Sequence, residues 1–218
     1  MRNMQLAVFI LLAGSLAVSP AQNEEKLQSG PKAGAVIPSA FECYNVNGSA
    51  KGRQHCFVCR FGLNPAVILF AKEPAEGKDD VFNELLKQLE QTADDFQERG
   101  FGVGVVVLSP DARDSTNNAD EEKTEELVKE AVMREKLVER ITERAKPYKH
   151  VVIGVFPEKG PTKYNLNPKA DVTIIFYQRM KIVENYAFGA DELNGADVEG
   201  IVKRIREELP LRKKADAK

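Results

Sequence analysis

The chain has 218 residues, of which 31 are Lys or Arg and 33 are Asp or Glu, so its formal net charge is −2. A charge so close to zero excludes the broad basic surface that nucleic-acid binding requires, and we expect no nucleic-acid partner. The length suits one domain with a sizeable core. The three cysteines allow one disulfide and one further thiol in an oxidising compartment.

Residues 1–21 have the parts of a secretory signal peptide. Arg2 provides the positive start, residues 4–18 form an uncharged apolar run, and small residues precede Gln22. The run is short for a membrane-spanning helix and charged residues follow closely, so a retained anchor is the less favoured alternative. We therefore expect cleavage after Ala21, a secreted or periplasmic location, and no membrane insertion after cleavage.

Two segments precede the expected core. Residues 22–35 are polar and contain Gly and Pro, and we expect them to form a flexible leader. Residues 36–64 are expected to form a β-hairpin or a pair of edge strands. Their two extended stretches, 41–46 and 54–61, flank an Asn-Gly turn signal.

The main domain is expected from residue 65 to residue 209. Apolar runs predict strands at 66–71, 103–108, 151–156, 172–177 and 181–187. Periodic apolar faces predict helices from Asp79 or Asp80 to Gly100, at about 120–146, and at about 195–209. Alternating strands and helices imply right-handed parallel crossovers, and a late antiparallel hairpin joins the same sheet. The predicted fold class is α/β, a three-layer α/β sandwich with a mixed sheet, and residues 210–218 are expected to be a solvated basic tail.

This order of elements resembles the thioredoxin fold. Residues 64–71 resemble the central strand that leads into the active-site loop of thioredoxin-like proteins, and residues 171–177 with 181–183 resemble their final hairpin. The strand at 151–156 is similar to one in the peroxiredoxin and membrane-linked thioredoxin branches. The chain as a whole is similar to exported bacterial thioredoxin-like proteins with a short Cys-x-x-Cys hairpin ahead of the fold, and this resemblance implies redox work.

The redox centre that the resemblance implies is missing at its expected positions. In the family, a Cys-x-x-Cys follows the central strand at a helix N-terminus, where backbone N–H groups stabilise the thiolate. Here residues 72–78 contain no cysteine, which also excludes a peroxidatic Cys of the peroxiredoxin type in that loop. The family's cis-proline would precede Thr173, but this chain has Val172 at that position.

The chain instead has a Cys-x-x-Cys upstream, at Cys56 and Cys59. A disulfide between them requires a turn at Phe57 and Val58, because its Cα atoms must lie about 4.4 to 6.8 Å apart. In the favoured interpretation this bond is structural and staples the hairpin. In the alternative, the pair is catalytic: Cys56 attacks, Cys59 resolves, and basic neighbours lower the thiolate pKa. Residues 60–65 do not begin a helix, so we expect no contribution from a helix dipole.

Other chemistry for these cysteines is less favoured. Cys43 and His55 could complete a tetrahedral zinc set with the pair, but there is no second Cys-x-x-Cys, and we predict no metal. The run also lacks the His of a covalent haem site, and we predict no cofactor. Cys43 is expected to be free and buried, with an intermolecular bond as the alternative.

Four further motifs have simpler structural interpretations. The glycines of residues 100–104 close a helix and open a strand, whereas a nucleotide loop does the reverse. The acidic residues between 111 and 121 lack the spacing of an EF-hand. His150 is expected to be a polar residue at a strand end, and Asn47 begins a glycosylation sequon.

The sequence therefore predicts an exported thioredoxin-like domain with a binding or structural role, an unidentified protein partner, and a Cys56–Cys59 disulfide. The alternative is an extracytoplasmic thiol–disulfide oxidoreductase that uses Cys56 and Cys59. The absent active-site positions favour the first hypothesis, and the family resemblance favours the second.

Overall fold

The computed structural model describes residues 26–73, 80–112 and 124–209. The expected signal peptide, the first residues of the expected leader and the expected basic tail lie outside the described residues. Within the described residues, no helix has both the length and the apolar composition needed to cross a membrane.

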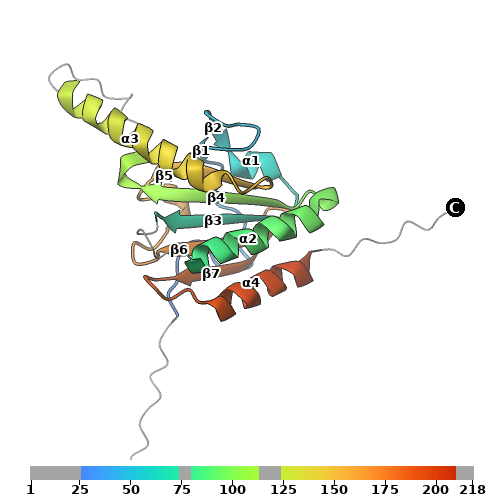
Figure 1. Ribbon diagram of the computed structural model, residues 1–218. Helices are drawn as coiled ribbons and strands as arrows, with labels where there is room; N and C mark the ends of the chain where they lie inside the picture. Colours follow the sequence, from blue (N-terminus) through green and yellow to red (C-terminus); the bar gives the residue numbers. More distant parts are fainter. Residues whose placement is uncertain (1–25, 74–79, 113–123, 210–218) are drawn as a thin grey trace, which may run out of the picture.

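Seven strands form a single mixed sheet in the part of the chain that the structure describes (Figure 1). They are β1 (Glu42–Asn45), β2 (Gln54–Cys56), β3 (Ala66–Lys72), β4 (Gly102–Ser109), β5 (Val151–Pro157), β6 (Val172–Gln178) and β7 (Lys181–Phe188). Their order across the sheet is β2-β1-β5-β4-β3-β6-β7. The pairs β3–β4 and β4–β5 are parallel and the other pairs are antiparallel. The predicted α/β class with a mixed sheet is confirmed.

The helices are α1 (Phe57–Phe61), α2 (Asp80–Asp95), α3 (Thr124–Ala145) and α4 (Gly195–Glu208), with short 3-10 turns η1 (Gln97–Arg99), η2 (Pro110–Ala112) and η5 (Thr162–Tyr164). The side chain of Asn194 caps α4 by accepting from the backbone N–H groups of Ala196 and Asp197. The β6–β7 turn has positive φ at both Arg179 and Met180, as in the type I′ turns that match the twist of a hairpin. The antiparallel hairpin predicted at this place is therefore confirmed.

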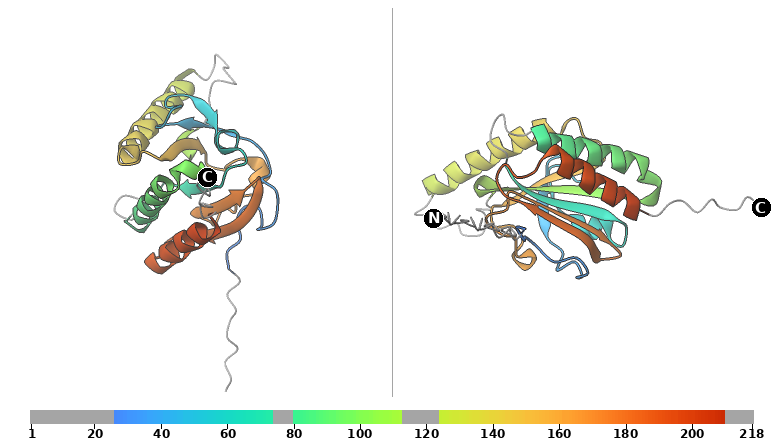
Figure 2. Two further views of the ribbon diagram at one scale, coloured as in Figure 1. Left: turned by 90° about the vertical axis from the view of Figure 1, so that its right-hand side faces the viewer. Right: turned by 90° about the horizontal axis from the view of Figure 1, so that it is seen from below.

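The three long helices lie on one face of the sheet (Figure 2). Leu85 of α2, Leu137 of α3 and Val198 of α4 belong to one apolar cluster on that face. The chain steps in one direction from β3 to β4 to β5, so two right-handed crossovers place α2 and α3 on the same side. The opposite face is covered by shorter pieces, including α1, η5 and the segment at Phe41. The third layer of the predicted sandwich is thus made of short segments.

The predicted N-terminal hairpin is part of this main sheet. β1 pairs with β2 on one side and with β5 on the other. The extended stretch predicted at 54–61 was wrong in its second half, because β2 ends at Cys56 and α1 follows at once. Buried Phe57, Val58 and Phe61 anchor this single helical turn, which is too short to show a helical period in the sequence.

The expectation of a flexible leader was wrong for residues 26–35. Ser29 is 3% exposed, and its hydroxyl lies 2.7 Å from the hydroxyl of Thr173 in β6. The side chain of Asn185 in β7 donates to the carbonyl oxygens of Ser29 and Pro31. Polar residues that resemble a linker in sequence here satisfy buried backbone groups along the sheet.

Candidate functional site

Cys56 and Cys59 form a disulfide, with their Cα atoms 5.2 Å apart. Phe57 and Val58 between them are the first residues of α1, so the turn that the bond requires is present as a helical turn. The predicted pairing of these two cysteines is confirmed.

Cys56 is also the N-cap of α1. Its Sγ accepts a hydrogen bond from the backbone N–H of Cys59 at 3.0 Å. The expectation that no helix would support this pair was wrong, because the helix begins between the cysteines and not after them. When the disulfide is reduced, the same N–H group can stabilise a thiolate on Cys56.

The two cysteines differ in exposure. Cys59 is exposed, whereas Cys56 is only 7% exposed. The residue that solvent and partners reach is therefore the second cysteine, and we expected the first to be the attacking one.

Two aromatic side chains hold α1 against the sheet. The rings of Phe57 and Phe61 lie over β4, at Gly104 and Gly102 respectively, where a Cβ would overlap them. Gly102 and Gly104, which resembled part of a nucleotide loop, thus form the surface of β4 on which α1 packs. The alternation Gly-x-Gly in an otherwise apolar strand was the available signal, because a missing Cβ often marks a close approach of another segment.

Basic side chains lie on α1 and in the β1–β2 loop before it. Arg60 donates to the hydroxyl of Ser49 at 3.0 Å, and Arg53 donates to the carbonyl oxygen of the same residue at 3.3 Å. Lys51 lies exposed in the same loop. No ion pair joins these three cations to a carboxylate among the described residues. The nearest acid in the β1–β2 register is Glu42, which is opposite Cys56.

Cys43 is free and 1% exposed, as expected. Its Sγ lies 3.4 Å from Oδ1 of Asn45, and burial raises the pKa of its thiol to about 12. A thiol in this environment remains protonated and unreactive at neutral pH. Within the described residues, no group of three or more His, Cys, Asp or Glu side chains is placed to hold a metal ion.

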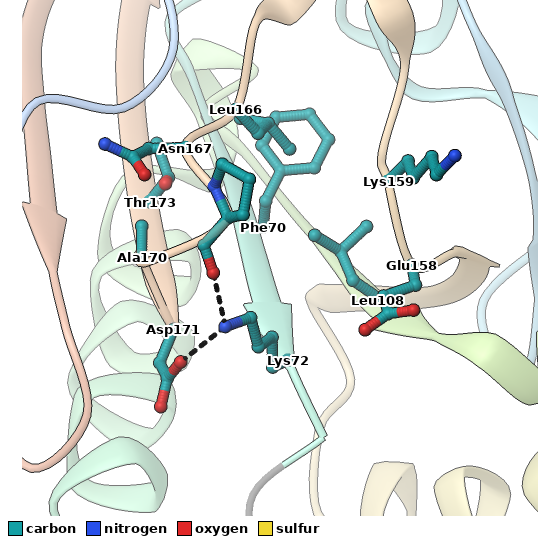
Figure 3. A pocket seen from close by; sticks show the side chains of 11 residues that line it. Phe70, Lys72, Leu108, Glu158, Lys159, Leu166, Asn167, Ala170, Asp171 and Thr173 are labelled. Atoms are coloured by element: carbon teal, nitrogen blue, oxygen red, sulfur yellow. Dashed lines mark hydrogen bonds and ion pairs between the residues drawn. The ribbon is translucent and has the colours of Figure 1, made fainter.

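A pocket lies where the resemblance to thioredoxin-like proteins placed the active site (Figure 3). It encloses about 480 Å³ at the carboxyl ends of β3 and β4, with apolar walls that include Phe70 and Leu108. At its edge, Nζ of Lys72 lies 2.8 Å from Oδ1 of Asp171 and 2.8 Å from the carbonyl oxygen of Pro168 (Figure 3). The adjoining loop, residues 74–79, lies outside the described residues.

This pocket is remote from the disulfide. The rings of α1 lie over Gly102 and Gly104, and the pocket reaches Leu108 farther along the same strand. At a rise of about 3.3 Å per residue, the two places are about 13 to 20 Å apart along β4. Thr173 lines the pocket, and its preceding residue is Val172, where the family has proline.

Two other residues from the sequence motifs have structural contacts. The side-chain amide of Asn47 donates to the carbonyl oxygen of Val151 and accepts from the N–H of Ile153, so it continues the β1–β5 ladder. His150 lies at the start of β5, with Nε2 3.3 Å from Oδ1 of Asp94. The acidic stretch after residue 112 lies mostly outside the described residues.

Comparison with known proteins is informative at the level of structure. No family model matches the chain, and no curated protein matches its sequence. A candidate protein disulfide isomerase of Bacteroides thetaiotaomicron is similar over 84% of this chain and 94% of its own, with 13% identity and a TM-score of 0.51. A thiol:disulfide interchange protein from a Bacteroides species covers 87% of this chain and 95% of its own, with 16% identity and a TM-score of 0.48.

The exposed lipoprotein thioredoxin of Streptococcus pneumoniae covers 78% of this chain and 99% of its own, with 13% identity and a TM-score of 0.45. At such identities the similarity concerns the fold and not the activity. The element order, the mixed sheet and the first of these comparisons agree with the resemblance seen in the sequence. The chain is therefore a thioredoxin-fold protein, with a Cys56–Cys59 disulfide on a helix outside the usual active-site loop.

Proposed function

We propose that this protein is an exported thiol–disulfide exchange protein that uses the Cys56–Cys59 pair. The observation that carries the proposal is the disulfide itself. It lies at the N-terminus of a helix, its Cys59 is exposed at the surface, and it closes a loop of only a few residues. A non-catalytic domain with a structural bond, the function favoured by the sequence, is the second candidate.

A structural disulfide would add little to the stability of the protein at this place. In the chain-entropy treatment, stabilisation grows with loop length, from about 2 kcal/mol for a four-residue loop to about 3 kcal/mol for fifteen residues. The Cys56–Cys59 bond joins the end of β2 to the first turn of α1, which are already adjacent in the chain. Moreover, the buried rings of Phe57 and Phe61 hold α1 on the sheet without it.

The proposed exchange begins at the exposed cysteine. A partner thiolate attacks Sγ of Cys59, a bond forms between the partner and Cys59, and the Cys56–Cys59 bond breaks. The electron pair leaves on Sγ of Cys56, where the N–H of Cys59 stabilises the new thiolate. Cys59 is thus the attacked sulfur and Cys56 the leaving one.

A second partner thiolate then completes the reaction. It attacks the partner sulfur in the mixed disulfide, the partner gains a disulfide, and Cys59 leaves as a thiolate. Two electrons have moved from the partner dithiol to the cysteine pair, and Cys56 and Cys59 take up the two protons that the partner lost. The reverse sequence reduces a partner disulfide, with Cys59 attacking.

Export is supported by the sequence of residues 1–21 and by the chemistry of the pair. An oxidising compartment keeps a Cys-x-x-Cys pair closed between turnovers, which is the state observed. Fractionation of cells that produce the full chain tests this part of the proposal: a processed protein shorter by the 21 residues is expected outside the cytoplasm.

A trapping experiment tests the exchange and the roles together. Single variants Cys56→Ala and Cys59→Ala are reduced and mixed with the uncharged 4,4′-dithiodipyridine. We expect Cys59 in the first variant to react at least about tenfold faster than Cys56 in the second, because only Cys59 is exposed. Cys43 is common to both variants and serves as the internal background.

Equal or reversed rates would contradict the assigned roles. The reduction potential of the wild-type pair then decides between exchange and staple. A potential below about −300 mV, with slow exchange, would show a structural bond and refute the proposal. A higher potential with rapid exchange is the expected result.

A further inference from the structure

We infer that the partner presents its cysteine in a segment with acidic side chains beside it. This inference rests on the proposed function, and it names the chemistry of the partner that the exposed cysteine receives. It is carried by the distribution of charge around α1.

The segment that contains Cys59 has an excess of positive charge although the chain as a whole is slightly negative. Between residues 41 and 64 there are three permanent cations, Lys51, Arg53 and Arg60, and one acid, Glu42. A local positive field raises the concentration of anionic partners and speeds their association. It also favours the thiolate form of an approaching partner cysteine.

The two arginines of this segment are positioned by hydrogen bonds, and neither has a carboxylate partner among the described residues. Both guanidinium groups bind Ser49, which holds them close to each other and to α1. Three other arginines of the described residues are paired with carboxylates: Arg140 with Glu73, Arg204 with Glu184 and Arg206 with Asp95. Arg60 follows Cys59 directly, and Arg53 is joined to Arg60 through Ser49. Guanidinium groups without carboxylate partners are suited to bind the carboxylates of another molecule.

An exposed apolar residue adjoins the same surface. Leu63 lies two residues after the end of α1 and is 69% exposed, one of the few large apolar side chains in the described residues with such exposure. A peptide segment can contact Leu63 and the arginines together while its cysteine reaches Cys59. A small thiol can make fewer of these contacts, so we commit to a protein segment as the partner.

The test uses three peptides of equal length, in which one cysteine is flanked by two Asp, two Ser or two Lys residues. The rate at which each peptide reduces the oxidised protein is measured and divided by its rate with an uncharged reference, 2-hydroxyethyl disulfide. We expect the normalised rate of the Asp peptide to exceed that of the Lys peptide by about tenfold at low salt, and the ratio to fall towards one at about 0.5 M salt.

Matched variants assign the effect to the two arginines. The double variant Arg53→Glu and Arg60→Glu is expected to reverse the order of the peptides. Lys87→Glu makes a charge change on α2, on the opposite face of the sheet, and is expected to leave the order unchanged. Because Arg53, Arg60 and Lys87 are all exposed, folding should survive each change, and circular dichroism checks this.

The outcomes separate the two proposals. Equal normalised rates for the three peptides, with rapid exchange, would overturn the acidic partner and leave thiol exchange intact. Failure of every peptide to reduce the pair would overturn the proposed function, and the inference with it. A preference for Asp that also persists in the double arginine variant would show that other charges cause it, which overturns the role given to Arg53 and Arg60.

Discussion

The cysteine helix α1 and the pocket at the carboxyl ends of β3 and β4 differ in what each contributes. The first region has a disulfide, a backbone N–H donor to sulfur and the guanidinium group of Arg60. The second has a concave apolar site at the end of the central strand, with Lys72 paired to Asp171, and no cysteine. In the family that the chain resembles, the sulfur chemistry belongs at the second place. The difference shows that a fold does not determine where its cysteine pair lies.

The two regions also depend on different forces. α1 is held by aromatic rings packed on glycine backbone, and a single added methyl group would overlap these rings. The pocket edge is held by a half-exposed ion pair, which solvent screens. Changes around α1 should therefore have larger effects on stability than changes at the pocket.

The largest effect is expected for Phe57→Ala. Phe57 is fully buried against Gly104, so its removal leaves a cavity beneath α1 and should lower the free energy of unfolding by about 3 to 5 kcal/mol. Urea unfolding followed by fluorescence or circular dichroism measures the change.

A double variant shows whether Phe57 and Gly104 act as one contact. Gly104→Val alone should also destabilise the protein, by about 1 to 3 kcal/mol, through overlap with the ring. In the double variant with Phe57→Ala, the loss in free energy of unfolding should be smaller than the sum of the losses in the two single variants. Gly200→Ala in α4, where nothing lies within 4 Å of the added Cβ, is the control and should be neutral or slightly stabilising. Strictly additive changes in the free energy of unfolding would contradict the packing of Phe57 on Gly104.

A second effect concerns pH and Cys43, which lies on the same side of the sheet as α1. Burial raises the pKa of its thiol from 9.0 to about 12, so between these values the unfolded chain ionises and the folded chain does not. Stability is complete below pH 9 and falls as the pH rises. Near pH 10.5 the loss from this group should be about 2 kcal/mol.

The variant Cys43→Ala isolates this contribution. Burial also raises the pKa of Tyr164 and Tyr177, so the wild-type protein has further losses at high pH from these phenols. The denaturation midpoint of Cys43→Ala should therefore fall less steeply than that of the wild type between about pH 8 and pH 10.5. Identical slopes would show that the thiol is not held in its neutral form.

Reduction of the Cys56–Cys59 bond should cost about 2 kcal/mol, as expected for so short a loop. The free energies of unfolding of the oxidised and reduced proteins give this difference directly, and Cys56→Ala with Cys59→Ala gives it without a reductant. A loss much larger than this, with detachment of α1, would favour a staple over an exchange site.

The smallest effect is expected at the pocket. Lys72→Met removes the partner of Asp171, and both side chains are more than a third exposed, so stability should fall by no more than about 1 kcal/mol. The rate at which a thiol reduces Cys56–Cys59 should not change, because the pocket lies at the other end of β4. A reduced exchange rate in this variant would show that the two regions work together.

Local patterns in the sequence were sufficient for most of the fold. The apolar runs of β3 and β4 and the apolar face of α2 each bury their own residues, so their types follow from composition and period. The helix α1 was not predictable in this way, since five residues show no period. The fixed position of Ser29 was also hidden, because its partners, Thr173 and Asn185, lie more than a hundred residues away.

The mixed sheet, the signal-peptide features, the Cys56–Cys59 spacing and the lack of cysteine in residues 72–78 could all be read from the order of the residues. The cap that Cys56 makes on a helix, the exposure of Cys59 and the room that two glycines of β4 leave for that helix became known from the folded chain. Composition and period are properties of neighbouring residues. Exposure, capping and close packing depend on which distant segments meet, and they are settled only when the chain has folded.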